Sequence, residues 1–179
     1  DMARGVAHLF EAVGAPPDIA KRMAVWMVNG DLSGHTSHGV EASRAYIRQI
    51  LEGATQATER PTVVDETATT LILDGRLGFG YLCADEITRL LAAKAQVHAV
   101  AIGTAINCNH IGRLGEWVEL AAELGVLMLL SVAGSGVNAR AVAPYGGIEG
   151  RLHTNPWAFA APSADGTPLM LDVATSAVA

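Results

Sequence analysis

Residues 100–132, VAIGTAINCNHIGRLGEWVELAAELGVLMLLSV, contain the clearest fold signal of the chain. The stretch begins with a β-rich apolar run at 100–106, continues with a helix-forming segment at 112–124 and ends with a second apolar run at 126–132. An alternation of strand, helix and strand is typical of an α/β layer in which some strands run parallel. The stretch therefore predicts a mixed α/β layer.

The first 60 residues show the periodicity of amphipathic helices instead. Helices are expected over residues 2–13, from the Pro16-Pro17 pair to about residue 30, and from about residue 41 to residue 51. The N-terminal third of the chain is therefore predicted to be a helical segment.

The remaining elements flank the quoted stretch. Residues 62–64 and 70–73 are short β-rich runs that predict a hairpin, and a helix is expected over about 81–97. Two further strands are expected over 157–161 and 169–171. We therefore expect an α/β protein with an N-terminal helical segment followed by a mixed α/β sheet layer.

Composition limits the kinds of partner. Of the 179 residues, 50% are hydrophobic and 17% are charged, so a substantial core can form. The net charge of −6 and the lack of a basic run argue against a nucleic-acid or anionic-membrane partner. The longest apolar run, 124–134, has about half the ~20 residues of a membrane-spanning helix and is expected to be a buried strand.

Two further features concern the setting of the chain. Cys83 and Cys108 form no Cys-x-x-Cys pair and are too few for a disulfide framework, so a reduced, cytoplasmic protein is expected. The chain begins without Met and stops at Ala179 with no helix cap or polar tail. We therefore expect a fragment of a longer protein.

Ser37-His38-Gly39 is the first candidate for proton-transfer chemistry. The unperturbed pKa of His, about 6.5, lets it give and take protons near neutral pH. Reduction of a ketone needs such a donor at the oxygen, and the Ser37 hydroxyl could orient the imidazole or pass the proton on. The structural alternative is that His38 caps a helix beginning near Glu41, with Ser37 satisfying backbone donors.

Asn109-His110-Ile111-Gly112 is the second candidate, at the start of a predicted helix. A helix N-terminus suits a phosphate or a carboxylate, and Gly112 and Gly115 would let a ligand approach the backbone. The same glycines could instead serve tight packing of helix on strand. Arg113 is unfavourable with the helix dipole, which favours an anionic partner for it.

Asp172, which ends the apolar run 169–171, is the third candidate. A carboxylate in this position could hold an imidazole in one tautomer and stabilise its charged form. Alternatively, Asp172 could cap a following helix.

Several common motifs are absent. Neither 75–80 nor 134–136 matches Gly-x-Gly-x-x-Gly, so an ordinary Rossmann fingerprint is missing. There is also no Gly-x-Ser-x-Gly elbow and no P-loop. His35 and His38 with Cys108 and His110 could be imagined as zinc ligands, but their separation is long and the first pair lies in an expected loop. No metal site is predicted.

Four ordered segments carry a resemblance to a known family: 34–40 (GHTSHGV), 109–113 (NHIGR), 153–156 (HTNP) and 171–176 (LDVATS). Together they resemble the malate/L-lactate dehydrogenase family of non-Rossmann NAD(P)-dependent oxidoreductases. The motifs His-Ile-Gly-Arg and Ala-Thr-Ser-Ala are most similar to those of the hydroxycarboxylate dehydrogenase B branch. The likeness extends over essentially the whole chain, and family members are about twice as long.

The resemblance implies reversible oxidation of a 2-hydroxy acid to a 2-oxo acid with NAD or NADP. His38 would be the proton donor or acceptor, with Ser37 and Asp172 as relay partners. The cofactor would contact His38 and two segments: His110, Ile111, Gly112, Arg113 and Leu114, and Met170, Leu171, Asp172, Val173 and Ala174. The hydride chemistry itself belongs to the nicotinamide.

The resemblance also implies an organisation. Residues 1–60 would be the N-terminal helical part of the substrate and dimerisation domain, and residues 61–179 would be the first part of the NAD(P)-binding domain. The protein would be a homodimer with its active site near the subunit interface.

One position departs from the family pattern. Many relatives carry Arg four residues after the first His, where its planar fork can bind a carboxylate, but this chain has Ala42. Arg44 and Arg48, together with His110, are therefore the expected substrate-binding residues, with Arg113 as a further arginine that could substitute. Small dicarboxylates become less favoured substrates. A cyclic imine acid reductase and a non-catalytic dimerising fragment remain alternative functions.

Overall fold

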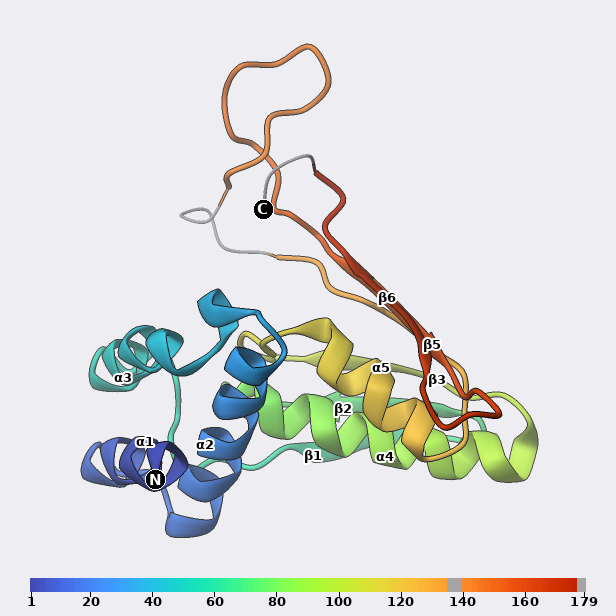
Figure 1. The fold of residues 1–179 in the computed structure, drawn as a ribbon, viewed down its shortest axis with the longest axis horizontal. Helices are drawn as coiled ribbons and strands as arrows, with labels where there is room; N and C mark the ends of the chain where they lie inside the picture. Colours follow the sequence, from blue (N-terminus) through green and yellow to red (C-terminus); the bar gives the residue numbers. More distant parts are fainter. Residues whose placement is uncertain (135–139, 177–179) are drawn as a thin grey trace. The chain divides into compact units, whose positions relative to one another are not determined.

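The computed structural model of the chain describes residues 1–134 and 140–176 (Figure 1). It divides into two compact units, here called the N-terminal unit (Asp1–Arg113) and the C-terminal unit (Leu114–Ala179). The assignment of residues 1–60 to substrate binding and dimerisation, and of 61–179 to cofactor binding, concerns function and stays a prediction.

The N-terminal unit begins with the expected helices. These are α1 (Met2–Ala12), α2 (Pro17–Leu32) and α3 (Ser43–Leu51), with two short 3-10 helices between the last two, η1 (Thr36–His38) and η2 (Val40–Ala42). Asp1 starts α1, because its carboxylate accepts a hydrogen bond from the backbone N–H of Ala3 at 3.2 Å. Helices α1 and α2 are packed together, and Phe10, Ile19 and Met23 are fully buried.

A three-stranded sheet completes this unit. Strands β1 (Thr62–Glu66) and β2 (Thr70–Asp74) form the expected antiparallel hairpin, and β3 (Ile102–Ile106) pairs with β2 in parallel. Helix α4 (Gly80–His98) makes the crossover between β2 and β3 and packs on the sheet. Its core contacts join Leu71 and Leu73 of β2 to Cys83 and Ile87 of α4.

The C-terminal unit has one helix, α5 (Leu114–Glu123), and three strands, β4 (Met128–Ser131), β5 (Trp157–Ala161) and β6 (Leu169–Val173), among its described residues. The strands form a separate antiparallel sheet in the order β4-β5-β6. Helix α5 packs on this sheet, where Trp117 and Val118 are buried with Ala158 and Ala160 of β5.

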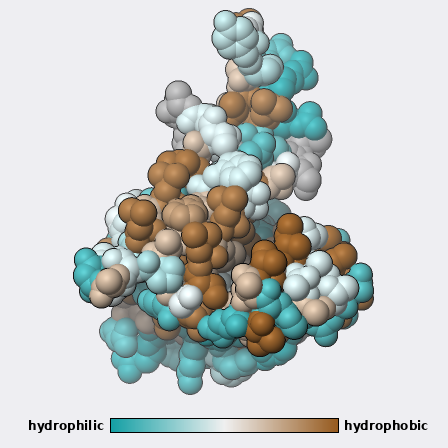
Figure 2. Space-filling view, turned by 90° about the vertical axis from the view of Figure 1, so that its right-hand side faces the viewer, coloured by the Kyte–Doolittle hydropathy of each residue, from teal (hydrophilic) through white to brown (hydrophobic). Residues whose placement is uncertain are grey.

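Two expectations need correction here. The expected mixed α/β architecture is confirmed, but the strands on either side of α5, β3 and β4, belong to different sheets, because β3 pairs with β2 and β4 pairs with β5. The apolar run 124–134 is not a buried strand either, since Leu127 and Leu129 are 62% and 61% exposed. Exposed apolar residues occur elsewhere too, and brown hydrophobic side chains are visible in Figure 2. No helix in the described ranges is long and apolar enough to cross a membrane.

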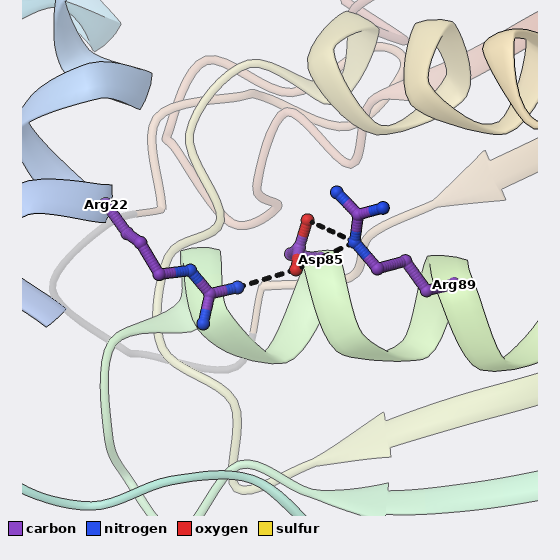
Figure 3. Close-up of polar contacts among 3 residues, drawn as sticks. All are labelled: Arg22, Asp85 and Arg89. Carbon is purple, nitrogen blue, oxygen red and sulfur yellow. Dashed lines mark hydrogen bonds and ion pairs between the residues drawn. The ribbon is translucent and has the colours of Figure 1, made fainter. Parts of the chain in front are cut away.

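A buried carboxylate joins α2 to α4 in the N-terminal unit (Figure 3). Asp85, on α4, is 4% exposed, and its Oδ2 lies 2.6 Å from Nη2 of Arg22 on α2. Nε of Arg89, one turn later on α4, donates to both carboxylate oxygens at 3.1 and 3.2 Å. The guanidinium of Arg22 also lies over the ring of Trp26, at 5.0 Å from the ring centroid.

The contacts of Asp85 with Arg22 and Arg89 yield a stability prediction. Asp85→Asn removes the negative charge that both guanidinium groups share, and we expect the free energy of unfolding to fall by about 2 kcal/mol. The matched control is Asp18→Asn, which breaks an exposed pair with Arg60 and should change stability little. Urea unfolding of both variants measures the difference. Equal effects would show that the burial of Asp85 adds nothing.

Candidate active site

The chain holds the Ser37-His38-Gly39 segment against the end of α2. The Asp31 carboxylate accepts a hydrogen bond from the backbone N–H of Val40 at 3.0 Å. A Cβ on Gly39 would lie 1.8 Å from Oδ1 of Asp31, so no larger residue fits unless that carboxylate moves. The sequence therefore positions His38 through one acidic side chain and one glycine.

The imidazole of His38 makes two contacts that suit proton transfer. Its Nδ1 lies 2.9 Å from the hydroxyl oxygen of Ser37. Its ring stacks on the ring of His110, with centroids 5.3 Å apart and an interplanar angle of 29°. The alternative in which His38 caps the next helix is not what the structure shows, since α3 begins after Ala42 without a side-chain cap. Ser37, His38 and His110 thus lie together, and their roles stay predictions.

Asn109 fixes the backbone that carries His110. Its side-chain nitrogen lies within hydrogen-bond distance of the carbonyl oxygens of Leu77 and Gly78, at 2.8 and 3.0 Å, and of the Thr55 hydroxyl at 3.1 Å. Gly112 has a φ of +74°, and a Cβ there would lie 2.4 Å from the Tyr81 ring. This turn brings the N–H of Gly112 to 3.3 Å from Nδ1 of His110.

Sequence reasoning missed the aromatic residues beside the two histidines. The Tyr46 hydroxyl, on α3, lies 2.6 Å from Nδ1 of His110. The ring of Tyr46 meets Tyr81 edge-on at 5.9 Å, and Tyr81 stacks on Trp26 at 5.9 Å. The Tyr81 hydroxyl donates to the backbone carbonyl of His38 at 3.3 Å. The available signal was a tyrosine on the buried face of a helix, where its hydroxyl needs a partner.

Desolvation sets the charge of these groups, although the His110 ring stays partly exposed to solvent. It lowers the pKa of His110 from 6.5 to about 4, and the nearby His38 adds to this shift. Burial also raises the pKa of Tyr46, with a further contribution from the neighbouring Tyr81 hydroxyl. At neutral pH, His110 is therefore a neutral imidazole and Tyr46 a neutral phenol.

The lowered pKa of His110 predicts a pH dependence of stability. Between about pH 6.5 and 4 the unfolded chain binds a proton on this imidazole and the folded protein does not, so stability falls as the pH falls through this window. His110 should therefore account for part of the stability that is lost between about pH 7.5 and 5. Urea unfolding at both pH values, with His110→Gln as the comparison, measures this share. An equal loss in the variant would contradict the prediction.

The predicted substrate-binding arginines lie on the outer face of α3. Ala42 and Tyr46 are four residues apart and therefore share a helical face. Arg44 and Arg48 are each two residues from Tyr46, a rotation of about 200°, and both are exposed. Arg113, in contrast, is buried. A substrate role for Arg44 and Arg48 stays a prediction.

In the C-terminal unit, Asp172 binds the start of a helix. Its Oδ2 accepts a hydrogen bond from the N–H of Gly115 in the first turn of α5 at 2.7 Å. The carboxylate expected at this helix N-terminus is thus supplied by the chain itself, and the helix that Asp172 binds precedes it rather than follows. The neighbouring cofactor candidates Met170, Leu171 and Val173 lie with it on β6 and are exposed.

Two of the family-like segments also meet in this unit. Thr175 donates from its hydroxyl and its N–H to the carbonyl of Thr154, at 2.7 and 3.1 Å. The side chain of Asn155 accepts from the N–H of Gly134 at 3.2 Å. Nε2 of His153 is buried with no hydrogen-bond partner in the described part of the chain.

Within residues 1–134 and 140–176, no three His, Cys, Asp or Glu side chains lie close enough together to hold a metal ion.

Known proteins resemble this chain along its whole length. The profile of the family described as malate/L-lactate dehydrogenase matches residues 1–179. Hydroxycarboxylate dehydrogenase B of Escherichia coli (strain K12) is 35% identical over 174 residues, which cover 97% of this chain and 48% of that protein. The Delta(1)-pyrroline-2-carboxylate/Delta(1)-piperideine-2-carboxylate reductase of Pseudomonas putida is 33% identical over 171 residues, covering 96% and 49%.

A solved structure gives the same answer. Malate dehydrogenase from Pyrococcus horikoshii OT3 superposes with a TM-score of 0.90 at 34% identity, over 99% of this chain and 49% of that one. The chain spans about half the length of the curated relatives that it matches. Sequence and fold agree on one conclusion: the chain belongs to the malate/L-lactate dehydrogenase family.

Proposed function

We propose that the protein to which this chain belongs is an NAD(P)-dependent dehydrogenase that interconverts a 2-hydroxy acid and its 2-oxo acid. The observation that carries the proposal is the stacked His38–His110 pair, 5.3 Å between ring centroids, in a chain of this family. A side chain that can give and take a proton, beside a second imidazole, is what a hydroxyl-to-carbonyl conversion requires.

His38 is the proposed acid and base. In the tautomer in which its Nδ1–H donates to Ser37, Nε2 carries the lone pair that would accept the proton of the substrate hydroxyl. In the reverse direction, the imidazolium returns that proton to the carbonyl oxygen. The Ser37 hydroxyl can accept a hydrogen bond from Nδ1–H and so orients the ring in this tautomer. Asp172 is kept as the third relay member on the family likeness, although its described contact is with Gly115.

The cofactor is proposed on the same likeness. One observation fits a bound nicotinamide nucleotide: Nε2 of His153 is buried without a described partner in a family-like segment, so a polar group of a ligand would satisfy it. Residues 110–114 and 170–174 are the proposed contacts. The cofactor, when bound, supplies the hydride chemistry, while this chain's residues orient the substrate and move the proton.

Three further attributes belong to this proposal. They are a homodimer, the use of either NAD or NADP, and a reduced cytoplasmic setting. The last agrees with Cys83 and Cys108, which are both free thiols.

The test is hydride transfer from NADH or NADPH to a panel of 2-oxo acids by the full-length protein. We expect consumption of one reduced nucleotide with a monocarboxylic 2-oxo acid, and weaker turnover with small dicarboxylates because Ala42 lacks a guanidinium. If none of the acids is turned over and neither nucleotide binds, the proposal is wrong.

A second candidate is reduction of a cyclic imine acid. It is favoured by the 33% identity to the Pseudomonas putida reductase named above. Adding a cyclic imine carboxylate to the same panel separates the two, since the better substrate has the higher kcat/KM.

A further inference from the structure

The contacts of His110 determine which of its nitrogens carries the proton. Nδ1 lies 3.3 Å from the backbone N–H of Gly112, a group that can only donate. A ring nitrogen that accepts must present a lone pair, so Nδ1 is unprotonated. The Tyr46 hydroxyl, 2.6 Å from the same nitrogen, then donates to it as well.

A neutral imidazole has one N–H, so the proton of His110 must lie on Nε2. His110 is neutral at pH 7, because desolvation on the side that faces the protein and the neighbouring His38 lower its pKa to about 4. Its Nε2 is thus a hydrogen-bond donor without a formal charge. A neutral donor beside His38 can bind a substrate oxygen and still allow His38 to become protonated, because it adds no like charge to the pair.

Tyr46 is well placed to enforce this arrangement. It is 4% exposed, and its ring is held edge-on against Tyr81 at 5.9 Å. Since burial raises the pKa of Tyr46, its hydroxyl keeps its proton and remains a donor. Gly112 supplies the second donor, but at the longer distance, so the short Tyr46 contact is the stronger constraint on the tautomer.

We propose that Tyr46 is a positioning residue that fixes His110 as its Nε2–H tautomer, and that this N–H donates to an oxygen of the 2-oxo or 2-hydroxy acid. The tautomer assignment stands on the contacts of His110, whereas the substrate contact rests on the proposed function. Tyr46 itself does not touch the reacting atoms and acts only through His110.

The test is Tyr46→Phe in the full-length protein, which keeps the ring and removes the hydroxyl. Nitrogen-15 NMR of the histidines at about pH 7 is expected to show the His110 of the unaltered protein as a neutral imidazole protonated on Nε2. In Tyr46→Phe, a fraction of the molecules should carry the His110 proton on Nδ1 instead. With the accepted 2-oxo acid, KM should rise about tenfold while kcat changes less, because a contact made in both ground and transition states is weakened.

Tyr81→Phe is the matched comparison. It removes a buried tyrosine hydroxyl from the same aromatic group, but one that donates to the His38 backbone carbonyl rather than to an imidazole. The nitrogen-15 pattern of His110 should therefore stay unchanged in Tyr81→Phe.

Several results would overturn the proposal. An Nδ1–H or doubly protonated His110 in the unaltered protein does so without any variant, which covers the case in which Tyr46→Phe fails to fold. An unchanged tautomer in a folded Tyr46→Phe also does so, even if KM rises. If no 2-oxo acid is turned over, the proposed function and the substrate contact fail, whereas the NMR result still decides the tautomer role of Tyr46.

Discussion

His38→Gln is expected to lower kcat for 2-oxo acid reduction by about a thousandfold in the full-length protein. The glutamine side chain can still hydrogen-bond to Ser37, but it cannot give or take a proton near neutral pH. The loss should therefore appear in kcat and in kcat/KM alike, because the proton moves in the transition state. Steady-state kinetics at saturating reduced nucleotide measure both constants.

The control for this variant is His35→Gln. His35 is exposed and lies three residues earlier in the same segment, so the substitution tests for a general effect of removing an imidazole there. We expect kcat to remain within about twofold of the unaltered protein, as for a surface substitution away from the chemistry. If His38→Gln retains a comparable kcat, His38 is not the acid and base.

Gly80→Ala is expected to have the largest effect on stability. A Cβ on Gly80 would lie 2.0 Å from the backbone oxygen of Asn109 and 2.4 Å from that of His110. Backbone atoms cannot move aside as a flexible side chain can, so we expect the free energy of unfolding to fall by about 3 kcal/mol. The same displacement should move His110 away from Tyr46 and abolish most of the activity.

Gly5→Ala is the matched control. Gly5 is in the interior of α1, and a Cβ there would have nothing within 4 Å. Alanine is the better helix former, so stability should rise by about 0.5–1 kcal/mol. Urea unfolding of both variants should therefore give changes of opposite sign. A stabilised Gly80→Ala would show that the α4 start and residues 109–110 are not in close contact.

Local elements of this chain can be predicted from its sequence because their signals are local. The Pro16-Pro17 pair marks the start of α2, and the β1–β2 hairpin follows from two short β-rich runs. The pairing partner of each later strand, in contrast, cannot be predicted from local signals. Strand β3 pairs with β2 and β4 pairs with β5, and nothing in the run 100–132 encodes this choice, because pairing depends on which apolar faces are free in three dimensions.

In the candidate site, too, some residues can be found from the sequence and others cannot. His38 and His110 can be found by residue type, since few other side chains titrate near neutral pH. Tyr46 reads as one more apolar position of an amphipathic helix, and only its hydroxyl distinguishes it from a core residue. Its contact with His110 joins residues 64 positions apart, so no local pattern indicates it.

The parallel pairing of β2 with β3 has a consequence for the order of folding. Helices α1 and α2 are neighbours in the chain and can associate early, whereas β3 can join β2 only after the whole of α4 has closed the crossover. His110 follows β3, so it reaches Tyr46 only after this slow, non-local step. During refolding from denaturant, helical circular dichroism should therefore return before the two histidines stack, and recovered activity should lag behind it.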